Sequence, residues 1–235
     1  MAVGKCSPAP LRRLIKKVNR KLIQFSLQKF VKVTIFAFYL IYCPYVSAEQ
    51  SNTHLDKFLF GLETLEASFE QTLLNQYEEE IEKSVGIVRL RRPGMFHWTY
   101  TEPYEQNLIS DGINLWVYDK DLEQVSIRDI SNIIEASPAG ILGGEIDIDS
   151  YYIVIEYPGV DGSNWLELTP RDIESQYSVI RLEFLSDELV KMILFDALGQ
   201  VTQIELRNLQ RNIDLDIDVF QFTPPEGVDV IDSRE

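Results

Sequence analysis

The first regular hydrophobic pattern along the chain has a helical period. Its apolar residues recur three or four positions apart and are Leu55, Phe58, Leu59, Leu62 and Leu65. Charged residues lie largely between them, which is typical of an amphipathic helix with one face on a core. The pattern predicts a helix of about four turns, with Thr53 as its N-cap.

Beyond Ala67 the apolar period changes to two, and short alternating runs are separated by turn residues. The predicted strands are 68–74, 84–91, 95–101, 106–110, 114–118, 124–128, 151–157, 164–169, 179–185, 190–196, 201–209 and 219–223. Asp111-Gly112, Asp187-Glu188 and 198–200 predict tight hairpins between them. Since no long helix separates the runs, they predict an antiparallel sheet rather than βαβ units.

One apolar stretch, 131–144, does not follow the strand pattern. It reads SNIIEASPAGILGG and contains two apolar pairs on either side of Ser137-Pro138. The stretch predicts one or two short helices, the first capped by Ser131. These helices are too short to bury their apolar residues against themselves, so we expect them to pack on another part of the molecule.

The N-terminal 48 residues differ in charge from the rest of the chain. The net charge is −15, but residues 1–48 contain nine Lys or Arg and no Asp or Glu, which leaves −24 for the remainder. The apolar run over 33–46 is shorter than a membrane-spanning helix and ends in Val46-Ser47-Ala48, a pattern typical of a cleaved signal peptide. We expect cleavage after Ala48 and a single domain over 49–235, with a retained anchor as the alternative.

Composition and motifs argue against several functional classes. The acidic main part would be repelled by nucleic acids, and both cysteines, Cys6 and Cys43, lie in the N-terminal segment. His54 and His97 share no metal-ligand spacing, and no phosphate-binding loop or nucleophile motif occurs. We expect no catalytic residue, metal or cofactor. A glycosidase-like pair of carboxylates stays open, because any two carboxylates can meet in space.

The stretch 91–104, RRPGMFHWTYTEPY, holds the most informative combination of residues. Phe96, Trp98 and Tyr100 alternate along one predicted strand, so the three rings share one face. They would line either a core or a cavity. Arg92 precedes Pro93 at the start of this stretch. At the edge of an apolar concavity its guanidinium could donate several hydrogen bonds to the carbonyls of a movable segment.

Several further stretches have an order and spacing that together are specific. They are SFEQT at 68–72, RRPGMFHW at 91–98, the segment around Pro103, SDGINLWVYD at 110–119, LEQV at 122–125, SPAGILGG at 137–144 and FTPPEGV at 222–228. In these stretches the chain resembles LolA, the outer-membrane lipoprotein carrier family of Gram-negative bacteria. The resemblance covers nearly all of 49–235. The acidic stretch 78–82 matches none of its motifs.

The resemblance implies a mainly β fold of the α+β class. This fold is an unclosed antiparallel β-barrel covered by a lid of short α-helices, with an apolar cavity between them. The resemblance also implies a periplasmic chaperone without catalytic activity, whose cavity takes the acyl chains of lipoproteins. An inner-membrane ABC transporter of the LolCDE type would supply the lipoproteins, and an outer-membrane receptor of the LolB type would receive them. We expect a monomer.

By the same resemblance, Arg92 is the arginine that hydrogen-bonds the lid backbone and holds the empty cavity shut. The residues expected to line the lid or the acyl-chain cavity are Leu59, Phe69, Phe96, Trp98, Trp116, Ile133, Ile134, Ile141 and Leu142. Two alternatives stay open at this point. One is an outer-membrane receptor or an envelope-stress sensor of the same fold, and the other is a periplasmic carbohydrate hydrolase.

Overall fold

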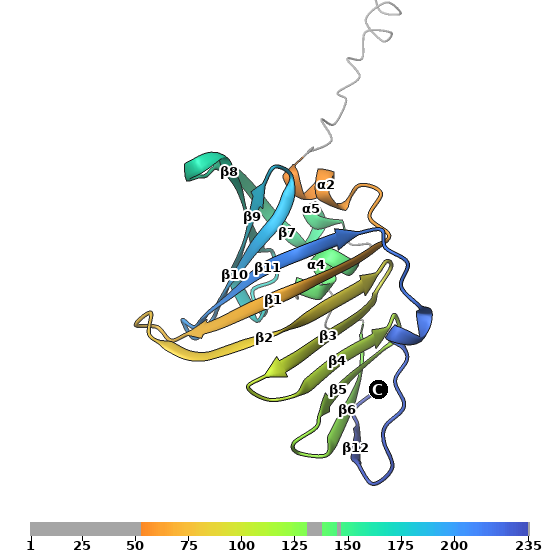
Figure 1. Ribbon diagram of the computed structural model, residues 1–235. Helices are drawn as coiled ribbons and strands as arrows, with labels where there is room; N and C mark the ends of the chain where they lie inside the picture. The colour runs from red at the N-terminus through yellow and green to blue at the C-terminus, as the bar shows by residue number, and fades with distance from the viewer. Residues whose placement is uncertain (1–52, 131–137, 145–146, 235) are drawn as a thin grey trace, which may run out of the picture. The chain divides into compact units, whose positions relative to one another are not determined.

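A computed structural model describes residues 53–130, 138–144 and 147–234 (Figure 1). The predicted signal peptide over 1–48 and both cysteines lie outside these residues, as do Ser131, Ile133 and Ile134. Within the described ranges, no helix is long and apolar enough to cross a membrane.

The described residues form twelve strands. These are β1 (Thr64–Leu74), β2 (Glu80–Arg91), β3 (Met95–Glu102), β4 (Gln106–Asp111), β5 (Asn114–Asp119), β6 (Gln124–Asp129), β7 (Tyr152–Pro158), β8 (Ser163–Pro170), β9 (Tyr177–Leu185), β10 (Glu188–Asp196), β11 (Val201–Arg211) and β12 (Asp229–Asp232). They make one sheet in the order β12-β6-β5-β4-β3-β2-β1-β11-β10-β9-β8-β7. Because β12 and β7 are the two ends of this order, the barrel is unclosed, which confirms the predicted fold class.

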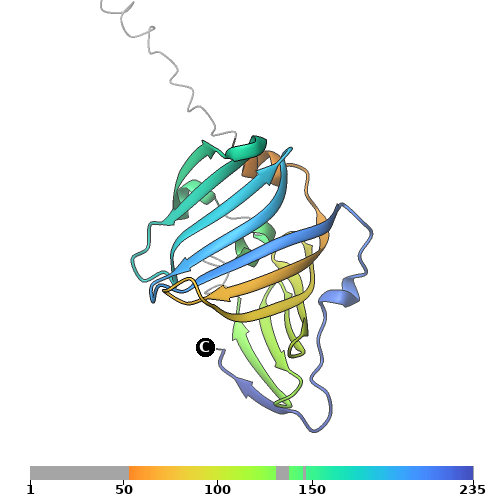
Figure 2. The ribbon, with the colours of Figure 1, turned by 60° about the vertical axis from the view of Figure 1, so that its left-hand side comes forward.

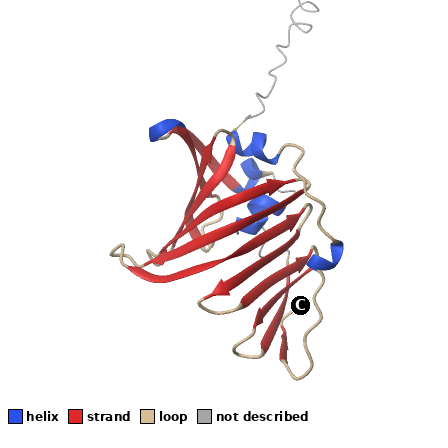
Figure 3. Ribbon diagram, in the orientation of Figure 1, coloured by secondary structure: helices blue, strands red, loops and turns tan. Residues whose placement is uncertain are grey.

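Short helices lie on the concave side of the curved sheet (Figures 1 and 3). They are α2 (His54–Leu59), α4 (Pro138–Gly143) and α5 (Ile148–Tyr151). Two 3-10 turns, η1 (Val160–Gly162) and η2 (Ile217–Phe220), complete the described elements. The predicted helix in the second half of 131–144 is therefore α4, whereas the first half of that stretch lies outside the described residues.

The first predicted helix is correct in its start and wrong in its length. Thr53 caps α2, because its hydroxyl accepts a hydrogen bond from the Asp56 N–H at 3.1 Å. The helix ends after Leu59, and Gly61 follows at a φ of +64°. Leu62 and Leu65 are buried as predicted, but Leu65 belongs to β1. Leu65 lies three positions after Leu62, a spacing that fits a helix. It is also the first residue in the alternating apolar pattern of β1, so the sequence pattern alone does not separate the two structures.

The predicted strand over 219–223 is also wrong. This segment contains the end of η2, and Phe220 is buried without belonging to a strand. The last strand is instead β12, which pairs with β6 in parallel, while the neighbouring pairs elsewhere in the sheet are antiparallel. Figure 2 shows the C-terminal segment running along the outside of the sheet to reach β12. The three predicted hairpins are confirmed, with positive φ angles at Gly112, Asp187 and Gly199.

Candidate functional site

Three aromatic side chains of β1 and β3 meet on the concave face of the sheet. The ring centroid of Phe69 lies 5.1 Å from that of Trp98 and 5.2 Å from that of Tyr100, which it meets edge-on. The β2 residue opposite Phe69 is Gly86, where an added Cβ atom would lie 2.7 Å from Phe69 Cζ. The glycine leaves the space that the Phe69 ring occupies, and the three rings form an aromatic floor.

Strand register continues this floor across the other half of the sheet. Leu166 of β8 aligns with Leu182 of β9, Leu182 with Met192 of β10, and Met192 with Ile204 of β11. All four side chains are buried. Since aligned residues on neighbouring strands share a face, the concave surface stays apolar across β8, β9, β10 and β11.

Helices α2 and α4 cover this surface in the described structure. Leu55 and Phe58 of α2 are buried, as are Ile141 and Leu142 of α4, and all four pack in the same apolar cluster as the floor. Helix α4 consists of the residues PAGILG and carries no polar side chain. The lid therefore rests on the floor mainly through apolar contact, and an apolar ligand would have to displace it.

Arg92 joins the two lid helices. Its guanidinium donates one hydrogen bond to the Leu59 carbonyl at the end of α2, at 3.1 Å, and another to the Gly144 carbonyl after α4, at 2.9 Å. The turn that carries Arg92 is itself fixed, because its N–H donates to the Glu63 carbonyl at 2.8 Å. Two residues on, the Gly94 N–H donates to the Gly143 carbonyl at 2.8 Å.

Two further lid contacts were not predicted from the sequence. Arg211, the last residue of β11, donates to the Phe58 carbonyl at 2.5 Å, and its guanidinium lies 5.0 Å from the Phe58 ring centroid. Asn212 accepts from the Glu63 N–H at 2.8 Å and donates to the Gly61 carbonyl at 2.9 Å. Together they hold the end of α2 and the turn after it on the sheet.

The structure brings together six of the residues predicted to line the cavity or the lid. In one buried apolar cluster lie Phe69, Phe96, Trp98, Ile141 and Leu142, and Leu59 packs against it. The expectations for Ile133 and Ile134 fall outside the described residues.

Trp116 lies on the opposite face of the sheet, so the prediction that it lines the cavity is wrong. Strand register aligns Trp98 with Leu108 and Leu108 with Val117, which places Val117 rather than Trp116 on the concave face. The Trp116 ring instead contacts Phe222 of the C-terminal segment, with centroids 6.4 Å apart. The C-terminal segment covers this part of the convex face, and Trp116 packs against it there.

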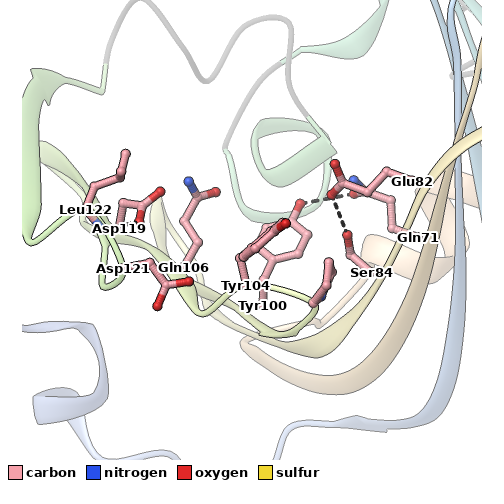
Figure 4. A pocket seen from close by; sticks show the side chains of 10 residues that line it. Gln71, Glu82, Ser84, Tyr100, Tyr104, Gln106, Asp119, Asp121 and Leu122 are labelled. Atoms are coloured by element: carbon pink, nitrogen blue, oxygen red, sulfur yellow. Dashed lines mark hydrogen bonds between the residues drawn. The ribbon is translucent and has the colours of Figure 1, made fainter.

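A polar pocket lies beside the aromatic floor, toward the ends of β1 and β3 (Figure 4). Its volume is about 470 Å³, and its lining comprises Gln71, Glu82, Ser84, Tyr100, Pro103, Tyr104, Gln106, Asp119, Asp121 and Leu122. The Tyr100 hydroxyl donates to Gln71 Oε1 at 3.0 Å. Burial of the phenol is the main cause that raises the pKa of Tyr100 to about 12. Along β3 the lining therefore changes from apolar at Trp98 to rich in hydrogen-bond acceptors around Tyr100.

The histidines have separate structural partners. His97 Nδ1 lies 3.0 Å from the Val219 carbonyl oxygen, which ties the C-terminal segment to β3. His54 contacts Glu156 of β7, and its Nε2 lies 3.4 Å from Asp187. Among the residues that the structure describes, no group of three or more His, Cys, Asp or Glu side chains could hold a metal ion.

These features define a half-open β-barrel whose apolar concave face is closed by two helices. The sequence profile of the family described as "Outer membrane lipoprotein carrier protein LolA" matches residues 61–223. Two relatives are both named outer-membrane lipoprotein carrier protein. The one from Nitrosospira multiformis is 35% identical over 85% of this chain and 97% of its own length. The one from Methylococcus capsulatus is 36% identical over 83% of this chain and 98% of its own.

The chain belongs to the LolA family of outer-membrane lipoprotein carriers. A solved structure of a LolA superfamily protein from Nitrosomonas europaea is 16% identical, with a TM-score of 0.44. The match covers 72% of this chain and 94% of that one.

Proposed function

We propose that this protein is a periplasmic carrier of lipoproteins. It binds their acyl chains after an inner-membrane ABC transporter has released them, and it delivers them to a receptor in the outer membrane. The observation that carries the proposal is the apolar concave face, which is buried under the short helices α2 and α4 rather than under further strands. Family membership supports the same function.

The cost of exposing acyl chains explains why a carrier is needed. Each buried CH₂ group contributes about 0.8 kcal/mol, so a sixteen-carbon chain in water would cost about 12 kcal/mol. Unassisted transfer across an aqueous compartment is negligible at that cost. The floor from Phe69 to Leu166 offers the apolar surface that could recover most of it.

Arg92 acts in this proposal as the latch of the empty carrier. Its two hydrogen bonds favour the closed lid, and the closed lid covers the apolar surface that the acyl chains need. Cargo and lid therefore compete for the floor, which allows both loading and release. No bond is made or broken in the cycle, so we propose no catalytic residue and place the energy-consuming step in the transporter.

The partners follow from the same proposal. They are acylated lipoproteins, a LolCDE-type transporter and a LolB-type receptor, and the carrier itself works as a monomer. The net charge of −24 on residues 49–235 would reduce adhesion to anionic membranes. This property is an advantage for a soluble shuttle between two membranes. We propose that residues 1–48 are the export signal and that the working protein starts at Glu49.

Mass spectrometry of the protein, purified from its own cell envelope without detergent, tests this function. We expect lipid-modified polypeptides to copurify in about equimolar amount and to be lost after a detergent wash. Failure to recover any lipid-modified polypeptide, together with failure to bind a synthetic diacylated lipopeptide, would overturn the proposal. The same spectra identify the N-terminus, where a free Glu49 supports the carrier and a lipidated Cys43 supports an anchored receptor.

A further inference from the structure

The indole nitrogen of Trp98 is a buried donor on the aromatic floor. The Trp98 residue is 5% exposed, and its Nε1 has no hydrogen-bond partner among the residues that the structure describes. Its aligned neighbours, Val88 on β2 and Leu108 on β4, are both aliphatic. The Phe69 ring lies against it at 5.1 Å. The indole also acts on the neighbouring Tyr100 hydroxyl, as a minor cause that lowers its pKa, but the two groups do not meet in hydrogen-bonding geometry. The N–H group is thus held in a mainly apolar setting without an acceptor of its own.

Buried indole N–H groups normally find an acceptor, because leaving a donor unpaired away from water is unfavourable. Tyr100, the next residue on the same face of β3, follows this rule and donates to Gln71. The Trp98 indole has no such acceptor. A phenylalanine at this position would fill an apolar floor without the cost of an unpaired donor. An unsatisfied donor in a binding surface is explained if its acceptor arrives with the ligand.

The position of Trp98 fits one particular part of the proposed cargo. Alternate residues on a strand lie about 7 Å apart, so Phe96, Trp98 and Tyr100 mark three successive depths on the concave face. Phe96 is buried at the lid end of β3, and Tyr100 lines the polar pocket (Figure 4). Trp98 lies at the boundary between the apolar and the polar part.

An acyl chain has the same order of groups. Its methylene groups are apolar, its head is polar, and a carbonyl that accepts but does not donate hydrogen bonds lies between them. The indole N–H donates but does not accept. Of the groups in an acylated polypeptide, an ester carbonyl at the boundary depth matches the indole in both chemistry and position.

We propose that Trp98 Nε1 donates a hydrogen bond to the ester carbonyl of an acyl chain bound on the concave face. The chain then runs under α4 past Phe96 and Ile141, and the polypeptide leaves through the polar pocket. The inference rests on the proposed function and adds to it that the carrier recognises the ester, not only the hydrocarbon.

Paired lipopeptide probes test the inference. One carries two palmitoyl chains in ester linkage to a glyceryl-cysteinyl peptide, and the other carries hexadecyl chains in ether linkage, without carbonyls. We expect the full-length carrier to bind the ester probe about threefold to tenfold more tightly, the effect of one neutral hydrogen bond. Replacing Trp98 by its benzothiophene analogue, in which sulfur replaces the N–H group, should abolish the preference for the ester probe.

The same replacement at Trp116 is the matched control, because that indole lies on the convex face. It should leave the preference for the ester probe intact. In ¹⁵N spectra, the ester probe should shift the Trp98 indole proton downfield, and the ether probe should not. Equal affinity of the unmodified carrier for both probes would overturn the inference and leave the proposed function standing. Failure to bind either probe would overturn both.

Discussion

Replacing Arg92 by leucine tests the latch directly. The substitution removes both hydrogen bonds to the lid carbonyls of Leu59 and Gly144 and leaves a shorter, apolar side chain at a half-buried position. We expect the variant to fold, because the apolar cluster of lid and floor is untouched. We expect it to load with cargo and to release that cargo poorly.

The magnitude follows from the two hydrogen bonds. A hydrogen bond that involves a charged group contributes about 1.5–3 kcal/mol, and the partial exposure of Arg92 favours the lower value. Loss of both destabilises the closed lid by about 3 kcal/mol, which changes the ratio of closed to open forms by roughly a hundredfold. Since only the open form binds cargo, the apparent dissociation constant should fall by up to the same factor.

Two measurements check this prediction. Titration with a fluorescent diacylated lipopeptide gives the apparent affinity, which should rise for Arg92→Leu. Transfer of the same lipopeptide to acceptor vesicles that carry the purified receptor gives the release rate, which should fall. An affinity and a release rate equal to those of the unmodified protein, in a variant with an unchanged circular dichroism spectrum, would refute the latch.

Two control variants separate the latch from charge alone. Arg92→Lys keeps the charge but cannot reach both carbonyls with a planar fork, so we expect an intermediate effect. Arg89→Leu, near the end of β2 and three residues before Arg92, removes a 2.5 Å ion pair with Glu66 that does not involve the lid. It should change neither affinity nor release.

Three further substitutions probe the floor and the convex face. Gly86→Ala places a Cβ atom 1.9 Å from the Thr99 carbonyl oxygen and should lower the unfolding free energy in urea by about 1–3 kcal/mol. Gly143→Ala, whose Cβ atom meets nothing within 4 Å, is its control. Burial raises the pKa of Tyr100 to about 12, so its ring stays neutral in the folded state while the unfolded state ionises near pH 10. Stability should therefore fall as the pH rises from 10 to 12, by up to about 3 kcal/mol. Tyr100→Phe should show a smaller fall in urea titrations at these pH values, and an equal fall would contradict the assignment. Phe220→Ala should cost about 3–5 kcal/mol in the same assay without changing lipopeptide affinity, because that side chain packs on the convex face.

The strands could be predicted because their signals are local. Alternation in β9, where Ile180, Leu182 and Phe184 are all fully buried, directly indicates one inward face. In β5 the same reasoning fails, since Leu115, Trp116 and Val117 put bulky residues on both faces. The sheet is covered on both sides there, by the lid and by the C-terminal segment, so alternation alone cannot assign a face.

The arginines of the lid show a second limit. The proposed role of Arg92 rests on the family resemblance that the local motif at 91–98 carries. Arg211 has no such motif, and its partner Phe58 is 153 positions away in the sequence. Only the pairing of β1 with β11 brings the two together. Contacts of this kind depend on the topology of the whole sheet, which a local pattern does not contain.

The lid also limits how tightly cargo can bind. Burial of one large aliphatic or aromatic side chain contributes about 1.5–3 kcal/mol, and four such side chains of α2 and α4 lie on the floor. Lifting all of them would cost about 6–12 kcal/mol, close to the 12 kcal/mol that one sixteen-carbon chain regains. The net affinity for cargo is then a small difference between the free energy gained by burying the acyl chain and the free energy lost by lifting the lid. A latch of about 3 kcal/mol at Arg92 is therefore large enough to shift the balance from holding cargo to releasing it.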